Sequence, residues 1–204
     1  MKRLTKKDFN VYLEEGALSQ PFLQVDYLEE KVNLDFNAKI KNRPQHTKLE
    51  SLFNWINHVI KFSNDKEFIK SNKFQRTAEE IWRSGFAVGC SDYALLFATF
   101  ARQLGWATTV LATAEINWFN NLQKGTNRCH SGHYFCECFY DDKWLLVDPT
   151  NKKIEKNYSL EVINLSYQLN NSHQFVPYLR CLDLGKRQNI KQHNQEMDIM
   201  CSNL

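Results

Sequence analysis

The sequence is poor in the two residues that most often interrupt regular structure, with seven glycines and four prolines among 204 residues. This composition excludes a collagen-like chain and a disordered chain rich in proline and glycine. The sequence also lacks any apolar run near the ~18 residues that a membrane-spanning helix needs. Its formal net charge is only +3, and the basic residues are scattered. We therefore expect neither a nucleic acid nor a membrane as partner.

A secretory signal is also missing, because no apolar segment follows the charged N-terminal residues 1–8. We therefore expect a cytoplasmic protein, and export by a route without such a signal stays open. In a reducing compartment, cysteines are expected as free thiols rather than as structural disulfides. The six cysteines are at positions 90, 129, 136, 138, 181 and 201.

Hydrophobic residues make up 43% and aromatic residues 13% of the chain, which suits one folded domain with a substantial core. In its first half, apolar residues recur at three- and four-residue spacing over 48–62 and over 90–104, which predicts two amphipathic helices. Thr77 and Glu80 match a capping box, which predicts a short helix that starts after Thr77, continues through Trp82 and ends near Gly85.

The second half of the chain predicts strands instead. β-Branched content and alternation indicate strands over 108–113, 133–140 and 143–148. We interpret 115–132 as a polar loop, and 159–184 as one or two further strands or a helix. Helices followed by strands along the chain indicate an α+β domain.

Cys90 lies where the second amphipathic helix is predicted to begin, directly after Gly89. A helix N-terminus carries partial positive charge and unpaired N–H groups, which favour a thiolate over a thiol whose ordinary pKa is ~8.5. The same N–H groups can bind the oxyanion of a tetrahedral intermediate. Asp92, in the first turn, would raise the pKa of the thiol, so a cationic partner is required from elsewhere in the fold.

The two adjacent strands supply such a partner. A turn at 141–142 pairs Glu137 with Leu146, and alternation then puts His133 and Asp148 on one face as diagonal neighbours. Their α-carbons are expected ~7–8 Å apart. An aspartate in this position can hold the imidazole in one tautomer and stabilise its protonated form. A slip of one residue in register would separate the two side chains.

Three motifs occur in the order Cys, His, Asp, at a helix start, on a strand and on the next strand. They are Gly89-Cys90-Ser-Asp-Tyr-Ala94, His133-Tyr-Phe-Cys-Glu137 and Trp144-Leu-Leu-Val-Asp148-Pro-Thr150. Together they resemble the transglutaminase-like superfamily, with its papain-like cysteine peptidase fold, in a small member of bacterial type. The resemblance implies a central helix that carries the cysteine at its N-terminus and packs on an antiparallel sheet that carries the histidine and the aspartate.

The resemblance also implies the roles of the three residues. Cys90 would be the nucleophile, His133 the general base and acid, and Asp148 the residue that orients His133. Phe135 stands where the family usually has a tryptophan, and we interpret this as a tolerated aromatic exchange. Pro149 and Thr150, which close the strand in this family, are unchanged here.

The resemblance covers about residues 48–150, and the flanks are unassigned by it. We predict three parts in the chain: an N-terminal helical extension, a transglutaminase-like catalytic domain and a polar C-terminal tail. Their ranges are 1–47, 48–185 and 186–204.

For function, the resemblance implies a cysteine-dependent hydrolase of amide or isopeptide bonds, of peptidase or deamidase type. It would act on a protein or peptide through an acyl-thioester. The alternatives are a protein-glutamine transglutaminase that uses the same residues, or an inactive protein-binding domain. No calcium-loop pattern is present, which argues against a calcium-dependent crosslinker. The oligomeric state stays open.

Three further residues are weaker candidates for the site. Trp55 and Gln75 precede the cysteine and each carries a side-chain N–H that can stabilise an oxyanion, although both can equally be structural. Glu137 shares a strand face with His133, where it would either meet the substrate or be a solvated strand residue.

One cysteine- and histidine-rich stretch resembles a set of metal ligands: Cys129-His130-x-x-His133-x-x-Cys136-x-Cys138. Alternation puts Cys136 and Cys138 on the strand face opposite His133, so one ion could not bind them all. The stretch also lacks a Cys-x-x-Cys pair. We favour packing of both cysteines in the core beside Leu145 and Val147, and we predict no metal and no other cofactor. The alternative is a zinc-binding regulatory domain.

Overall fold

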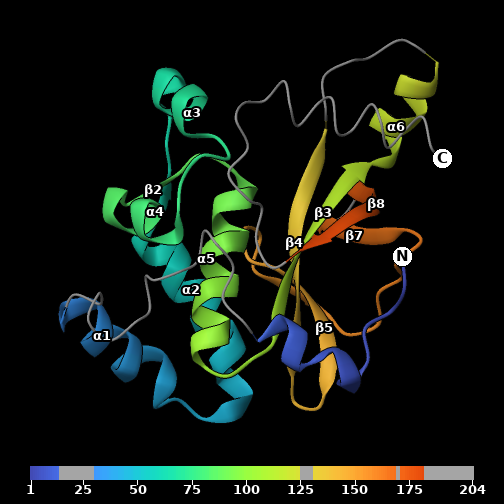
Figure 1. Cartoon of the computed structure of the whole chain (residues 1–204). Helices are drawn as coiled ribbons and strands as arrows, with labels where there is room; N and C mark the ends of the chain where they lie inside the picture. Colours follow the sequence, from blue (N-terminus) through green and yellow to red (C-terminus); the bar gives the residue numbers. More distant parts are fainter. Residues whose placement is uncertain (14–29, 125–130, 169–170, 182–204) are drawn as a thin grey trace.

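The computed structural model describes residues 1–13, 30–124, 131–168 and 171–181. Helices α1 to α5 gather on one side of a single large antiparallel sheet, and α5 (Cys90–Gln103) lies between the others and the sheet (Figure 1). Among these residues, no helix combines the length and the apolar character needed to cross a bilayer. The fold is therefore the α+β arrangement that the sequence predicts, with a cysteine at the N-terminus of the central helix.

The predicted helices are present, together with several that the sequence did not indicate. Both hydrogen bonds of the capping box between Thr77 and Glu80 are formed, and Gly85 ends that helix with a φ of +70°. This helix is α4 (Ala78–Ser84), and the other predicted helix besides α5 is α2 (Gln45–Val59). The helices whose positions the sequence did not indicate are the 3₁₀ helices η1 (Lys6–Asp8) and η2 (Asn10–Tyr12), α1 (Glu30–Phe36), the π-helix η3 (Asn37–Lys41), α3 (Lys66–Asn72) and α6 (Ile116–Gln123).

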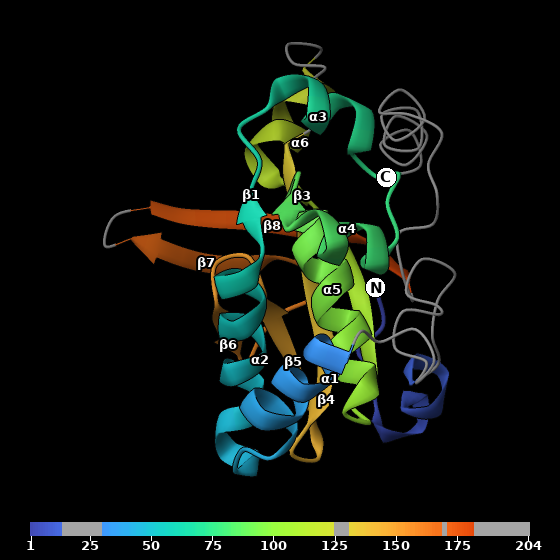
Figure 2. The ribbon, with the colours of Figure 1, turned by 90° about the vertical axis from the view of Figure 1, so that its left-hand side faces the viewer.

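The large sheet has the strand order β6-β5-β4-β3-β8-β7, and every neighbouring pair is antiparallel. Figure 2 shows the β7–β8 hairpin extending past the edge of the helical layer. A separate short pair, β1 (Lys61–Phe62) and β2 (Phe86–Ala87), is parallel. The strands of the sheet are β3 (Thr108–Glu115), β4 (Gly132–Tyr140), β5 (Lys143–Asp148), β6 (Lys153–Glu155), β7 (Ile163–Gln168) and β8 (Asn171–Cys181).

The β4–β5 hairpin has the predicted register, with Glu137 opposite Leu146. Asp141 and Asp142 form its two-residue turn, with φ values of +53° and +60°. Two consecutive residues with positive φ are what a tight turn needs to match the right-handed twist of its strands. Because the register is correct, the face-sharing predicted for β4 and β5 also holds.

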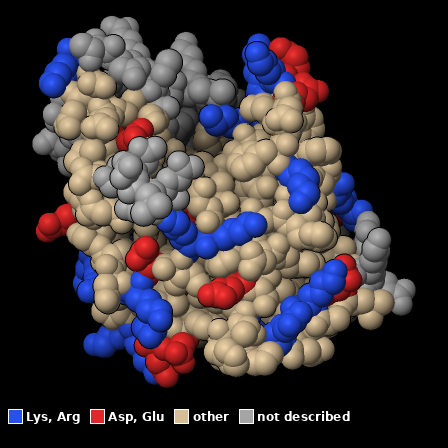
Figure 3. Space-filling view, turned by 180° about the vertical axis from the view of Figure 1, so that it is seen from behind, with Lys and Arg blue, Asp and Glu red and all other residues tan. Residues whose placement is uncertain are grey.

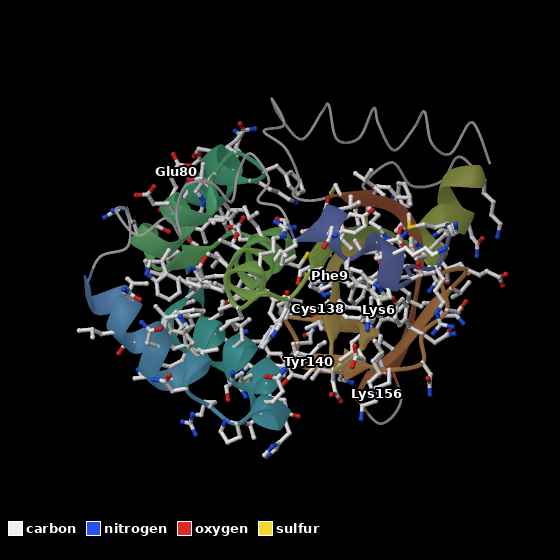
Figure 4. All side chains as sticks on the ribbon, turned by 60° about the horizontal axis from the view of Figure 1, so that its bottom comes forward. Lys6, Phe9, Glu80, Cys138, Tyr140 and Lys156 are labelled. Atoms are coloured by element: carbon white, nitrogen blue, oxygen red, sulfur yellow. The ribbon has the colours of Figure 1, made fainter. Side chains whose placement is uncertain are left out.

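The main core surrounds α5, where Phe97 and Phe100 are fully buried. Cys136 and Cys138 are also fully buried there, opposite Val147 and Leu145, and Figure 4 shows Cys138 in the interior. Their predicted role as core residues is confirmed. The other face of the sheet is covered as well. The N-terminal segment packs there, with the ring of Phe9 5.3 Å from that of Phe139.

The interpretation of 115–132 as a polar loop is wrong for its first half, because residues 116–123 form α6. Trp118 is buried in this helix, with 4% of its surface exposed. The asparagines and the glutamine of residues 116–123 made the helical spacing of the apolar residues there difficult to recognise. Further along the chain, 159–184 contains two strands, β7 and β8, rather than a helix.

The division of the chain into three parts stays a prediction. α2 begins at Gln45, and Phe36 and Ile40 before it are buried in the main core. The predicted tail, 186–204, lies outside the described residues. On the face of the molecule seen in Figure 3, basic and acidic side chains are interspersed.

Candidate active site

Cys90 lies at the N-terminus of α5, where no side chain caps the first backbone N–H groups. Gly89 is the N-cap of α5 and, having no side chain, makes no side-chain capping bond. The first N–H groups of the helix are therefore not occupied by a cap, and they add to the partial positive charge of the helix end. The Cys90 side chain is half-buried at this position.

The Cys90 thiol lies near the imidazole of His133 and the backbone N–H of Tyr134, and both of these groups lower its pKa. Burial alone raises the pKa of Cys90. The hydrogen bond and charge of His133, together with the Tyr134 N–H, outweigh burial, so the pKa of the thiol is lowered from its ordinary value. The cationic partner that the sequence required is therefore His133.

On its other side, the imidazole contacts Asp148. The distance from His133 Nε2 to Asp148 Oδ1 is 2.9 Å, although the Nε2–H is not aligned well enough for a linear hydrogen bond. Burial lowers the pKa of His133, but its contacts with Asp148 and Cys90 dominate and raise this pKa to about 10. Burial likewise raises the pKa of Asp148, and the contact with His133 reverses this, leaving the pKa below its usual value.

The Asp148 carboxylate is itself fixed by the turn that follows β5. Oδ1 accepts the backbone N–H groups of Thr150 and Asn151 at 3.1 and 3.0 Å, and Oδ2 accepts the Asn151 side-chain amide at 2.9 Å. Asn57 of α2 holds the same turn by donating to the Pro149 carbonyl at 2.7 Å. Sequence reasoning missed both asparagines. The sequence Asp-Pro-Thr-Asn, typical of an Asx turn, could have indicated the first.

Neighbouring residues limit the movement of the His133 ring. The rings of Phe135 and Phe175 lie 4.7 and 5.9 Å from it between centroids. The Thr113 hydroxyl donates to the His133 carbonyl at 2.9 Å. Only 12% of the His133 side chain is exposed, so the imidazole is held in place with a small opening to solvent.

Asp92 does not face the thiol as an unpaired charge. Its buried carboxylate forms an ion pair with Arg76 and accepts the backbone N–H of Val88. Burial raises the pKa of Asp92, and the Arg76 guanidinium opposes this rise. Arg76 thus neutralises the Asp92 charge that was expected to raise the pKa of Cys90. Nothing in the sequence pattern indicated Arg76 for this role.

Trp55 is placed in the helical core. Its indole packs on Trp82, Phe36 and Phe100, with ring centroids 4.8, 5.6 and 4.9 Å away. Phe100 lies ten residues beyond Cys90 on α5, which is about 15 Å along the helix axis. Trp55 is therefore a structural residue and not an oxyanion donor, because its indole N–H is too far from the start of α5 to reach an oxyanion there.

The two sequence neighbours of Gln75 each contact a residue next to the candidate site. The preceding Phe74 packs its ring 5.8 Å from that of Tyr134, next to His133. The following Arg76 is bonded to Asp92, close to Cys90. Gln75 is half-buried between these two anchors, so it stays a candidate oxyanion donor.

Glu137 neither faces solvent nor opens into the site, since it is fully buried. Its carboxylate forms an ion pair with Arg180, whose Nη2 lies 2.9 Å from Oε1, and it accepts the Tyr158 hydroxyl. Both expectations for Glu137, substrate contact and a solvated strand position, are wrong. The sequence could not show that the side chains of Arg180, from β8, and Tyr158, before β7, meet Glu137 across the sheet.

The metal-ligand pattern does not come together in the described residues, where no group of three His, Cys, Asp or Glu side chains could hold a metal ion. Cys136 points into the core and its thiol contacts the Ala94 carbonyl at 3.3 Å. Cys129 and His130 lie outside the residues that the structure describes.

Comparison with known proteins agrees with this arrangement. The family model of the transglutaminase-like superfamily matches residues 34–149. Among solved structures, the chain is similar to a candidate cysteine protease from Cytophaga hutchinsonii, with a TM-score of 0.56 and 14% identity. The match covers 89% of this chain but 50% of that protein, and at this identity it shows the fold alone. No curated protein matches.

The family match spans more than half of the chain, and it ends one residue after Asp148, so it includes Cys90, His133 and Asp148. The helix start, the strand and the turn that hold these residues have the order and geometry that the sequence motifs imply. The chain belongs to the transglutaminase-like superfamily.

Proposed function

We propose that this protein is a cysteine-dependent enzyme that cleaves an amide or isopeptide bond in a protein or peptide substrate. The observation that carries the proposal is the arrangement of His133, whose Nε2 lies 2.9 Å from Asp148 Oδ1 and whose imidazole lies near enough to Cys90 to lower the pKa of the thiol. A thiol with a lowered pKa beside an imidazole with a raised pKa favours the thiolate–imidazolium pair, which is the reactive form of such a nucleophile.

In the first step the Cys90 thiolate attacks the amide carbonyl carbon and a C–S bond forms. The carbonyl oxygen becomes an oxyanion near the uncapped N–H groups of α5, and Gln75 is the candidate for a second donor. Asp148 lies 2.9 Å from Nε2 of His133, so Nδ1 is the nitrogen that we assign to proton exchange with the thiol. The imidazolium gives its proton to the amine, the C–N bond breaks, and an acyl-thioester remains on Cys90.

In the second step His133, now neutral, takes a proton from water as the water attacks the thioester. The C–S bond breaks, a carboxylic acid leaves, and the thiolate–imidazolium pair is restored. A primary amine in place of water would give a transglutaminase, with the same residues in the same roles. We favour water because the fold neighbour is described as a protease, although membership of the superfamily is compatible with either acceptor.

The assay that tests the proposal supplies a glutamine-rich protein with a labelled primary amine and follows three products: ammonia, new termini and bound label. New termini, or ammonia without bound label, support hydrolysis, whereas bound label supports transfer, which also releases ammonia from glutamine. Cys90→Ser is expected to reduce any of them at least about 10³-fold, since the nucleophile is lost. Turnover that survives this substitution would overturn the proposal.

A second test separates the enzyme from an inactive binding domain. At about pH 6, iodoacetamide is expected to alkylate Cys90 much faster than Cys136 or Cys138, because burial raises the pKa of both core thiols, that of Cys138 to about 12. Mass spectrometry of tryptic peptides measures the rates. Equal labelling of the three residues would favour the inactive domain.

A further inference from the structure

A pocket of about 340 Å³ lies between α2 and η3. One face of α2 contributes to its lining through residues at the spacing i, i+3, i+4 and i+7, which are Ser51, Asn54, Trp55 and His58. Figures 1 and 2 show α1 and α2 at the end of the helical layer away from α3. The volume is in the range of pockets that bind small molecules, so we consider which ligand this lining suits.

The pocket is separate from the candidate active site. None of its lining residues, all of which the structure describes, is Cys90, His133 or Asp148. Its Trp55 packs on Phe100, which lies about 15 Å beyond Cys90 along the axis of α5. A ligand in this pocket would therefore bind without touching the proposed nucleophile.

The pocket is positively charged. Lys39 and Arg43 are part of its lining, and within this described lining no residue is acidic. Lys39 Nζ lies 3.4 Å from the carboxylate of Asp35 on α1, but both side chains are about half exposed. An exposed pair at this spacing is weak, so Lys39 can turn toward a ligand. Even with Asp35 counted, the two cations leave a net positive charge that favours an anion.

Hydrogen-bond donors accompany this charge. Arg43 donates from Nε to the Lys39 carbonyl at 3.3 Å, which fixes its guanidinium beside η3. Within the described residues, the Ser51 hydroxyl, the Asn54 amide and the Trp55 indole N–H have no hydrogen-bond partner. Ser51 is half-buried and Asn54 is exposed, so the polar groups of both can reach a bound molecule. The donor set favours a ligand that is rich in acceptor oxygens.

A phosphate group fits this combination better than a carboxylate. A phosphomonoester carries a charge of about −1.5 to −2 and three acceptor oxygens, and a guanidinium can bind two of these oxygens at once. A carboxylate has one charge and two oxygens, so it would use less of the donor set. At about 30 Å³ for each water molecule, the pocket has room for roughly ten of them. This is more than a phosphate ion alone would fill, so the ligand should carry an organic group.

We propose that the pocket between η3 and α2 binds a small organic phosphomonoester. Lys39 and Arg43 bind its phosphate oxygens, and Ser51 and Asn54 donate further hydrogen bonds to them. This site goes beyond the proposed function and does not depend on it, because Cys90 takes no part in the binding.

The test titrates the full chain with phenyl phosphate in an isothermal calorimeter at low ionic strength. We expect saturable one-to-one binding in the wild type and in Cys90→Ala. In Lys39→Gln/Arg43→Gln the Kd should rise at least about tenfold, because two charge-assisted hydrogen bonds are lost. In Ser51→Ala/Asn54→Ala, which keeps the charge, it should rise about threefold or more.

A second pocket on α2 offers the matched control. It is about 230 Å³ in volume, and its lining includes Lys143 and Lys156 together with Glu50 and Asp141. Lys143→Gln/Lys156→Gln removes the same charge from exposed positions and should keep the wild-type Kd. Thermal unfolding of each variant verifies that it is folded.

Four results would overturn the proposal. The first is the absence of saturable binding to the wild type. The second is an equal loss of affinity in the two charge-reduced variants with none in Ser51→Ala/Asn54→Ala, which would show non-specific attraction of anions. The third is binding of inorganic phosphate or benzoate as tight as that of phenyl phosphate, which would contradict the ligand class. The fourth is a phosphoserine heptapeptide that binds more than about tenfold tighter, which would assign the pocket to a phosphorylated polypeptide.

Discussion

Two ion pairs lie on the same face of β4, four residues apart, and they differ in the chemistry that they allow. His133 with Asp148 contacts a thiol, whereas Arg180 with Glu137 contacts the Tyr158 hydroxyl. Strand alternation places both pairs in the same way. They differ in the cation, because an imidazolium can give its proton to a reacting group and a guanidinium does not. The first pair can therefore take part in proton transfer, and the second can only hold the fold together.

Burial of the second pair is nearly complete, with 9% of the Arg180 side chain and none of the Glu137 side chain exposed. Burial also raises the pKa of Tyr158, and the neighbouring Glu137 charge adds to this, so its hydroxyl stays protonated as a donor. The first pair, by contrast, has a half-buried thiol and a partly exposed imidazole beside it. The comparison indicates that solvent exposure and the type of cation distinguish the proposed catalytic pair from the structural pair on this strand.

The largest expected effect on this comparison comes from Arg180→Met. It leaves the Glu137 carboxylate buried without its cation, which should cost about 3–5 kcal/mol in the free energy of unfolding. Thermal unfolding should show a decrease of at least about 6 °C in Tm for a chain of this size. In Glu137→Gln/Arg180→Met much of this loss should return, since no uncompensated charge remains. An unchanged Tm in the single variant would contradict a structural role for this pair.

A smaller effect is expected from Asp148→Asn. Loss of the carboxylate removes the largest contribution that raises the pKa of His133, so the imidazolium and with it the Cys90 thiolate become less stable. The rate of Cys90 alkylation should then fall at pH 6 and recover toward pH 9, and turnover should fall by about 10²-fold or more. The matched variant Asp142→Asn changes an exposed turn carboxylate and should leave the pH profile unchanged. A wild-type pH dependence of Cys90 alkylation in Asp148→Asn would contradict the proposed role of Asp148 in raising the pKa of His133.

The smallest of the three effects is expected from Asn57→Ala. It removes the hydrogen bond from α2 to the Pro149 carbonyl, which should cost about 1 kcal/mol of stability. Because this bond holds the turn that carries Asp148, turnover should fall more than the loss of stability alone explains. Chemical denaturation and steady-state kinetics measure the two quantities. A fall in stability with kcat unchanged would show that the turn keeps its position without Asn57.

The sequence was sufficient to predict the features that depend on local rules. The capping box at Thr77, the helix that begins at Cys90 and the β4–β5 register follow from capping, helical periodicity and strand alternation. The register alone was enough to bring His133 and Asp148 together. It is for this reason that the candidate site could be located before the fold was seen.

The features that the sequence did not show depend on contacts between distant segments. Arg76 meets Asp92 across sixteen residues and Arg180 meets Glu137 across forty-three, and no periodicity connects them. The burial of Glu137 also depends on Tyr158 and Arg180, which come from later segments of the chain. In α6, polar residues hid the apolar Trp118, so the helical pattern was too weak to favour a helix over a loop.

The unequal surroundings of the cysteines also bear on how the protein responds to oxidants. Peroxide reacts with thiolates, so Cys90 is attacked before the core residues Cys136 and Cys138, whose raised pKa values keep them as thiols. A sulfenic acid formed on Cys90 would abolish nucleophilic attack and leave the folded core intact. Mild peroxide should therefore switch activity off in a form that dithiothreitol restores, and only prolonged exposure should make the loss permanent.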